Sequence, residues 1–106
     1  MDVELTKDQE KLLTLIYKKY LESVKSGESK TTSARFESVE YKTWPKLEKW
    51  NKQDLSFTLA DLGKMKLINL YMGGDFNLTD RGTYYMENRF KSGLVEVTDF
   101  ITKFIP

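Results

Sequence analysis

The chain of 106 residues contains no cysteine and no histidine. Disulfide bonds, thiolate or imidazole zinc sites, thiol nucleophiles and histidine-based proton transfer are therefore excluded. No stretch approaches the roughly 18 consecutive apolar residues that a membrane-spanning helix needs. The first residues lack the basic and then apolar segments of a signal peptide. We therefore expect a cytoplasmic protein without membrane insertion, metal or cofactor.

What the chain does contain is enough apolar material for one core. Hydrophobic residues make up 40% and aromatic residues 13% of the sequence, so compositional disorder is not expected. The length fits a single domain over residues 1–106. We expect residues 1–93 to form its core and residues 94–106 to add a carboxyl-terminal helix.

The formal net charge is only +1, although strong nucleic-acid binders often carry a clear basic excess. The small excess falls within residues 28–66, which hold eight basic and six acidic residues. This excess is compatible with contacts to DNA phosphates and equally with an ordinary solvated surface. The candidate phosphate contacts are Lys42, Lys46, Lys49 and Lys66.

The first regular segment is an amphipathic helix over about residues 6–25. Thr6 can cap it, with Gln9 in the capping-box position, and apolar residues recur at three- and four-residue steps. Residues 30–50 are harder to interpret, and a short helix starting at Thr32 or Ser33 is expected to reach about Ser38. The lysines and aromatic residues around Pro45 suit either contact with nucleic acid or a cover over the core.

The next helix is expected from Asn51, an N-cap residue, to about Met65. Its core side carries Leu55, Leu59 and Leu62. The other face holds small and polar residues that could approach a DNA groove, and the candidates for base contacts are Lys52, Gln53, Ser56 and Lys64. Asp54 and Asp61 would repel phosphate unless they point elsewhere.

Residues 67–90 predict a short hairpin followed by a helix. Residues 67–71 and 76–78 read as strands, joined by a turn that contains two glycines and Asp75. A DNA-contacting turn would normally carry a basic residue at its tip, so closing the edge of the core is the better interpretation. Thr79 is expected to cap the next helix, and Gly93 to interrupt it.

The last segment, residues 94–105, has a strongly apolar helical face, which needs a partner. It can pack on the first helix, pair with a second copy in a homodimer, or rest on a membrane surface. Membrane contact is the weakest of the three, because the polar side carries two acids and one lysine. The candidate dimer contacts are Leu94, Val97, Phe100, Ile101 and Phe104.

Residues 51–90 resemble winged helix-turn-helix domains, through Leu59-x-x-Leu62, Leu67-Ile68 and the segment Leu78-Thr79-Asp80-Arg81-Gly82. Lys66 departs from that pattern, because a helix-ending glycine is usual there and lysine in the left-handed conformation is strained by roughly 1 kcal/mol. A different local geometry is therefore expected at Lys66. Residues 85–91 and 97–101 also look like a group of short winged-helix proteins from Gram-positive bacteria and their mobile elements.

The expected fold is mainly α-helical, of the α+β class: a winged helix-turn-helix with a short two-stranded wing and an extra carboxyl-terminal amphipathic helix. The resemblance implies double-stranded DNA as partner and a role as a small transcriptional regulator, with the helix at about 51–65 in the major groove. The alternative is a protein–protein interaction module of the same fold without DNA binding. No paired carboxylates or phosphate-binding loop point to catalysis, so no enzyme is expected.

Overall fold

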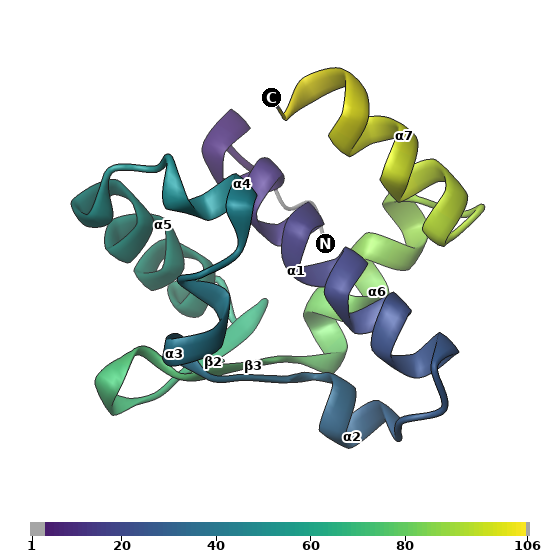
Figure 1. The fold of residues 1–106 in the computed structure, drawn as a ribbon, viewed down its shortest axis with the longest axis horizontal. Helices are drawn as coiled ribbons and strands as arrows, with labels where there is room; N and C mark the ends of the chain where they lie inside the picture. The colour runs from purple at the N-terminus through teal and green to yellow at the C-terminus, as the bar shows by residue number, and fades with distance from the viewer. Residues whose placement is uncertain (1–3, 106) are drawn as a thin grey trace.

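The computed structural model describes residues 4–105 as a mainly helical fold with a small three-stranded antiparallel sheet (Figure 1). Its elements are α1 Lys7–Lys25, α2 Lys30–Ser33, β1 Arg35–Phe36, α3 Ser38–Tyr41, α4 Pro45–Glu48, α5 Lys52–Lys64, β2 Ile68–Leu70, the 3-10 turn η1 Met72–Gly74, β3 Phe76–Leu78, α6 Asp80–Arg89 and α7 Leu94–Phe104. Within residues 4–105, no helix combines the length and the apolar character needed to cross a membrane.

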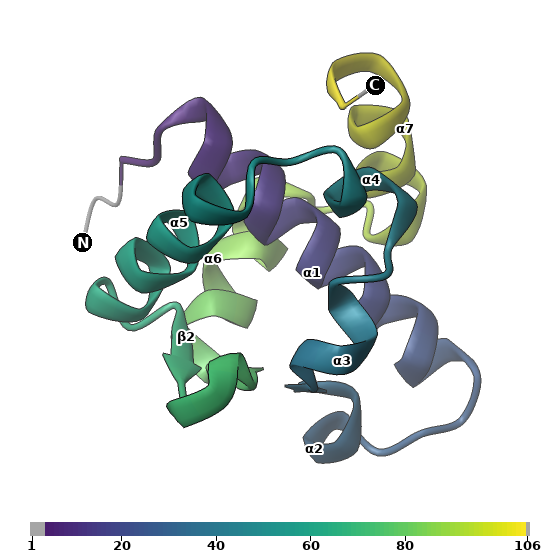
Figure 2. The same ribbon diagram turned by 60° about the vertical axis from the view of Figure 1, so that its left-hand side comes forward.

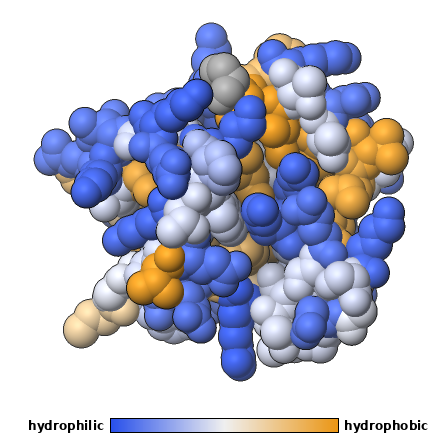
Figure 3. Space-filling view, in the orientation of Figure 1, coloured by the Kyte–Doolittle hydropathy of each residue, from blue (hydrophilic) through white to orange (hydrophobic). Residues whose placement is uncertain are grey.

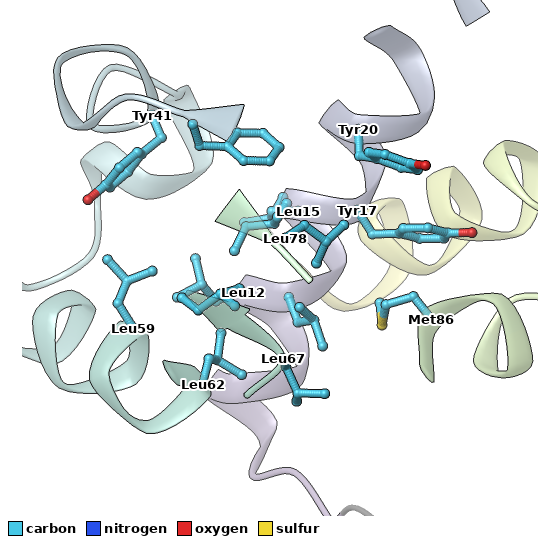
Figure 4. Packing of buried hydrophobic residues seen from close by; sticks show 14 of the residues in the cluster. Leu12, Leu15, Tyr17, Tyr20, Tyr41, Leu59, Leu62, Leu67, Leu78 and Met86 are labelled. Atoms are coloured by element: carbon cyan, nitrogen blue, oxygen red, sulfur yellow. The ribbon is translucent and has the colours of Figure 1, made fainter. Parts of the chain in front are cut away.

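Helix α1 forms the centre of the core. The predicted capping box is confirmed, since the Thr6 hydroxyl accepts from the Gln9 amide and the Thr6 amide donates to the Gln9 side chain. Helices α2, α5, α6 and α7 all contact α1. Figure 4 shows Leu12 and Leu15 of α1 between the leucines of α5 on one side and Met86 of α6 on the other. The amphipathic pattern of residues 6–25 therefore reflects packing.

The sheet has the order β1-β3-β2, and its central strand pairs with both neighbours. Strand β1 corrects the prediction of a helix from Thr32 or Ser33 to about Ser38. Helix α2 is capped earlier, by Ser29, and ends at Ser33, after which the chain extends. A strand of only two residues is too short to show the alternation of apolar and polar residues that marks a strand in the sequence. It forms because Phe36 lies opposite Phe76 and stacks on its ring at 5.1 Å.

Residues 38–50 form two single-turn helices that cover the core. The Trp44 ring is buried and meets the edge of Phe36 at 5.8 Å, while Trp50 is half-buried. The aromatic residues around Pro45 therefore pack on the core. This is the second of the two interpretations of the sequence, a cover over the core.

Helix α5 ends in a Schellman motif. The Leu67 amide donates to the Leu62 carbonyl, and the Lys66 amide donates to the Gly63 carbonyl. Lys66 takes the left-handed conformation, with φ of 62°, so the expectation of a different geometry at Lys66 was wrong. The motif persists without glycine because Leu62 and Leu67, the pair that flanks the turn, are completely buried.

The apolar face of α7 packs on α1, the first of the three arrangements considered for it. Val97 and Ile101 are buried within the chain, and Leu94 and Phe100 are half-buried. Phe104 is 57% exposed, and apolar residues show on the surface over α7 in Figure 3. Of the five candidate dimer contacts, two are thus taken up by the core. Pro106 lies outside the described residues.

Candidate nucleic-acid interface

Helix α5 lies along one side of the molecule, next to the β2–β3 hairpin (Figures 1 and 2). Its first turn is fixed by Asn51, whose side-chain oxygen accepts from the amides of Gln53 and Asp54 at 2.9 and 3.1 Å. The side toward the core buries Leu55, Thr58, Leu59 and Leu62. At 1.5 Å per residue the helix is about 20 Å long, which is enough to lie in a DNA groove.

The outward side of α5 carries the four residues predicted for base contacts. Lys52, Gln53, Ser56 and Lys64 are all exposed. In the described part of the chain, none of these four side chains forms a hydrogen bond or an ion pair within the protein. They are thus free to contact a partner.

Phe57 lies in the middle of this surface and is 61% exposed. It shares one stripe of the helix with Gln53, Ala60 and Lys64, at steps of four, three and four residues. Phenylalanine at this position was not among the candidate site residues. An aromatic residue that breaks the polar face of an amphipathic helix is the sequence feature that could have identified it.

The two acids of α5 lie together on another side of the helix. Asp54 and Asp61 are seven residues apart, so they occupy the same flank. The Asp61 carboxylate accepts a hydrogen bond of 3.3 Å from the Gln9 side chain of α1, which places this flank beside the start of α1. Negative charge is therefore kept to the α1 side, away from Lys52 and Ser56.

The four candidate phosphate contacts do not share one surface. Lys46 is half-buried, and its ammonium donates to the Ile105 carbonyl at 2.9 Å, so it holds the end of α7. Lys42 and Lys49 are exposed on either side of α4, and Lys66 is exposed at the left-handed turn after α5. Lys42, Lys49 and Lys66 thus remain exposed near the two ends of α5, whereas Lys46 serves the fold.

The turn of the hairpin is bound to α3. The Asp75 carboxylate accepts from the Ser38 amide at 2.8 Å, and the Tyr41 hydroxyl donates to the Gly74 carbonyl. Burial raises the pKa of the Tyr41 phenol, and the nearby Asp75 carboxylate raises it further. Asp75 therefore supplies the N-terminal cap that α3 lacks from its own residues, which agrees with the expected edge-closing role of the turn.

A pocket opens between α3–α4, the first turns of α5 and the hairpin. Its volume is about 320 Å³. Six of its residues are apolar or aromatic, and the remaining ones include Lys42, Glu48, Lys52 and Ser56. Two candidate DNA contacts from separate elements, Lys42 and Lys52, thus meet at one rim.

A wider polar groove of about 800 Å³ lies on the outer face of the sheet. Arg35, Asn77 and Asn69 form a row across the three strands, since Asn77 pairs with both of the others. The Tyr71 hydroxyl donates to the Asn77 side chain at 2.6 Å. Lys30 and Arg35 face this groove together with Asp80 and Glu87, so its charges balance.

The chemistry available elsewhere is limited. Burial raises the pKa of Tyr17 to about 12, and the Glu87 carboxylate contributes to the rise, so this phenol stays neutral near pH 7. Among residues 4–105, the acidic side chains nowhere gather in a group of three or more that could hold a metal ion.

Comparisons with known proteins give no matching family model, no matching curated protein and no matching solved structure.

Proposed function

We propose that the chain is a winged helix-turn-helix domain that binds double-stranded DNA through the outward side of α5, as a small transcriptional regulator. The order of elements supports this proposal: a surface helix of 13 residues, with one side exposed, is followed by a two-stranded hairpin and by α6. In winged helix-turn-helix domains, the helix before the hairpin is the one that enters the major groove. The proposal includes no enzymatic activity and no cofactor.

The observation that carries the proposal is the separation of charge on α5. The contact between Asp61 and Gln9 keeps the acidic flank beside α1. The opposite flank and the outermost stripe carry Lys52, Ser56, Gln53 and Lys64, all exposed. Glutamine can pair with adenine, lysine with guanine and serine with several bases, so these side chains can read base edges.

Phosphate contacts would come from Lys42, Lys49 and Lys66, which are exposed near the ends of α5. Lys46 is left out because its ammonium already binds the Ile105 carbonyl. If these three lysines neutralise about three phosphates, the affinity should fall roughly fortyfold between about 50 and 200 mM salt. Because the net charge of the domain is only +1, we do not expect its DNA affinity to fall much more steeply with salt concentration.

The test is the binding of random-sequence duplex DNA, measured by fluorescence anisotropy at about 50 and 200 mM salt. The double variant Lys49→Gln/Lys66→Gln, which removes two proposed phosphate contacts at the ends of α5, should weaken binding at the lower salt concentration and flatten the salt dependence. The matched control is Lys91→Gln/Lys103→Gln, which removes the same charge from two exposed positions beside and on α7. Equal effects of the two double variants would show that α5 is not the DNA-binding element.

A second candidate function is a protein interaction through the same side of the molecule. Phe57 on α5 is 61% exposed, and Leu70 and Met72 on the hairpin are 40% and 100% exposed. An apolar contact of this kind should respond little to salt. Absence of DNA binding at about 50 mM salt would favour this function over DNA recognition.

A further inference from the structure

The pocket of about 320 Å³ between α3–α4, α5 and the hairpin has the size of a small-molecule site. Ligand pockets in proteins range from about 300 to 1,000 Å³ and are lined mostly by apolar and aromatic side chains with a few polar groups. In Figure 4, the Tyr41 ring from α3 and Leu59 from α5 lie on the same side of the core, and both line this pocket. Residues of the hydrophobic core thus form the inner wall of this pocket.

The apolar lining suits a flat hydrophobic molecule. Leu47, Leu55 and Leu59 are buried residues of the core that border the pocket. Trp50 is half-buried and Leu70 is 40% exposed, so both can lose further surface to an occupant. Burying that area from water stabilises a bound apolar ring.

The rim of the pocket favours a negative charge. It carries Lys42 and Lys52 against the single acid Glu48, and the Ser56 hydroxyl adds a hydrogen-bond donor. Within residues 4–105, neither lysine forms an ion pair with a carboxylate. An anion at the rim would therefore meet two free ammonium groups without displacing an existing partner.

We propose that this pocket binds a small aromatic carboxylate, with its ring against Trp50 and Leu70 and its carboxylate at Lys42 and Lys52. Binding itself does not depend on the proposed DNA contact. If the protein also binds DNA, the ligand should lower its affinity for DNA, because both would use Lys42, Lys52 and Ser56. This consequence rests on the proposed function. Because the two binding equilibria are thermodynamically linked, DNA should then lower the affinity of the protein for the ligand by the same factor.

The test uses two probes of the same shape, indole-3-acetate and its neutral analogue indole-3-acetamide. Each is titrated into the uniformly ¹⁵N-labelled protein, and amide and indole N–H shifts are followed by NMR. The acetate should shift residues around the pocket, including Lys42, Ser56, Leu70 and the Trp50 indole. Its affinity should exceed that of the acetamide by at least about fivefold, because only the acetate carries the charge.

Variants locate the site and separate its two parts. Lys42→Gln/Lys52→Gln should lower the affinity for the acetate to that for the acetamide, while Lys91→Gln/Lys103→Gln should leave the difference intact. Leu70→Glu should abolish binding of the acetate, and Val39→Glu, at an exposed position of α3 outside the pocket, should not. Ser56→Trp, which fills the pocket from an exposed position, provides a second blocking variant should Leu70→Glu lose its dispersed spectrum.

Three results would overturn the proposal: equal affinities for the two probes, shifts centred on the polar groove around Arg35 and Asn77, or an absence of saturable shifts at pocket residues. Each can occur whether or not the protein binds DNA. Failure of the DNA titration alone would leave the ligand result standing, so the two proposals are tested separately.

Discussion

Adding one methyl group to α6 should damage the fold, while adding one to α5 should not. A Cβ atom at Gly82 would lie 2.2 Å from the Leu67 carbonyl oxygen and 2.9 Å from a methyl carbon of Leu78. Real Cβ atoms essentially never approach a heavy atom closer than 3.0 Å, and here the obstacle is backbone. Gly82→Ala must therefore move the start of α6 away from the hairpin.

That movement would break the junction between the hairpin and α6. The Leu67 carbonyl accepts from the Thr79 hydroxyl at 2.9 Å and from the Thr79 amide at 3.2 Å, and the Gly82 amide donates to the Thr79 hydroxyl at 3.0 Å. Overpacking typically costs about 1–3 kcal/mol, and each lost hydrogen bond about 1 kcal/mol. The gain in helix propensity from glycine to alanine is at most about 1 kcal/mol. We expect Gly82→Ala to lower the free energy of unfolding by about 2–4 kcal/mol.

Gly63→Ala in α5 is the matched control. Its added Cβ would meet only the Leu70 Cβ, at 3.6 Å, which is ordinary van der Waals contact, and Gly63 has an ordinary helical backbone. This variant should be as stable as the original chain or up to about 1 kcal/mol more stable. Urea unfolding followed by circular dichroism measures both. A Gly82→Ala protein within about 0.5 kcal/mol of the original would refute the reasoning.

Three further predictions concern single side chains. Lys66→Gly should raise the free energy of unfolding by about 0.5–1 kcal/mol, because glycine relieves the left-handed strain at φ of 62°, whereas Lys66→Ala should bring no gain. Asp75→Ala should lower it by about 1 kcal/mol through loss of the hydrogen bond from the Ser38 amide, while Asp75→Asn should retain most of the stability and lower the pKa of Tyr41. The third prediction concerns Tyr17, whose phenol favours its neutral form in the folded state because its pKa is raised to about 12. Its contribution to stability is therefore complete below pH 10 and is lost as the pH rises toward 12. Tyr17→Phe should reduce this alkaline loss of stability by about 2–3 kcal/mol.

Each of these has its own check. Equal stabilities of Lys66→Gly and Lys66→Ala would contradict the strain argument. Equal losses in Asp75→Ala and Asp75→Asn would mean that the charge, and not the hydrogen bond, is what matters. For the pH dependence, the control is Tyr84→Phe at a phenol that is 69% exposed, and urea unfolding between pH 9 and about pH 12 should be unchanged by it.

Much of the architecture follows from local patterns. The capping box at Thr6, the caps at Asn51 and Thr79, and the break at Gly93 mark helix boundaries that the structure confirms. Each of the three caps depends on a side chain that bonds to its own neighbouring backbone, and Gly93 has a positive φ that favours glycine, so a short window of sequence contains the whole cause. The hairpin was predictable for the same reason, from two glycines between short apolar runs.

The candidate site was only partly predictable. The sequence indicated which face of α5 turns away from the core, because burial follows the helical period, and all four of its candidates are exposed. It could not indicate that Lys46 binds the Ile105 carbonyl or that Asp61 accepts from Gln9, since these partners are 59 and 52 residues apart. Such contacts depend on how whole helices are placed relative to one another.

The sequence by itself determined the four long helices α1, α5, α6 and α7, the hairpin and the side of each that is apolar, because these depend on residues within a few positions of one another. Only the tertiary structure decided the rest. It pairs β1 with β3, seats α7 on α1 and brings Lys42 and Lys52 to the rim of one pocket. A strand of two residues is too short to leave a periodic pattern in the sequence, and a pocket between three elements leaves none. Both form only when burial of a shared core has fixed the distances between distant segments.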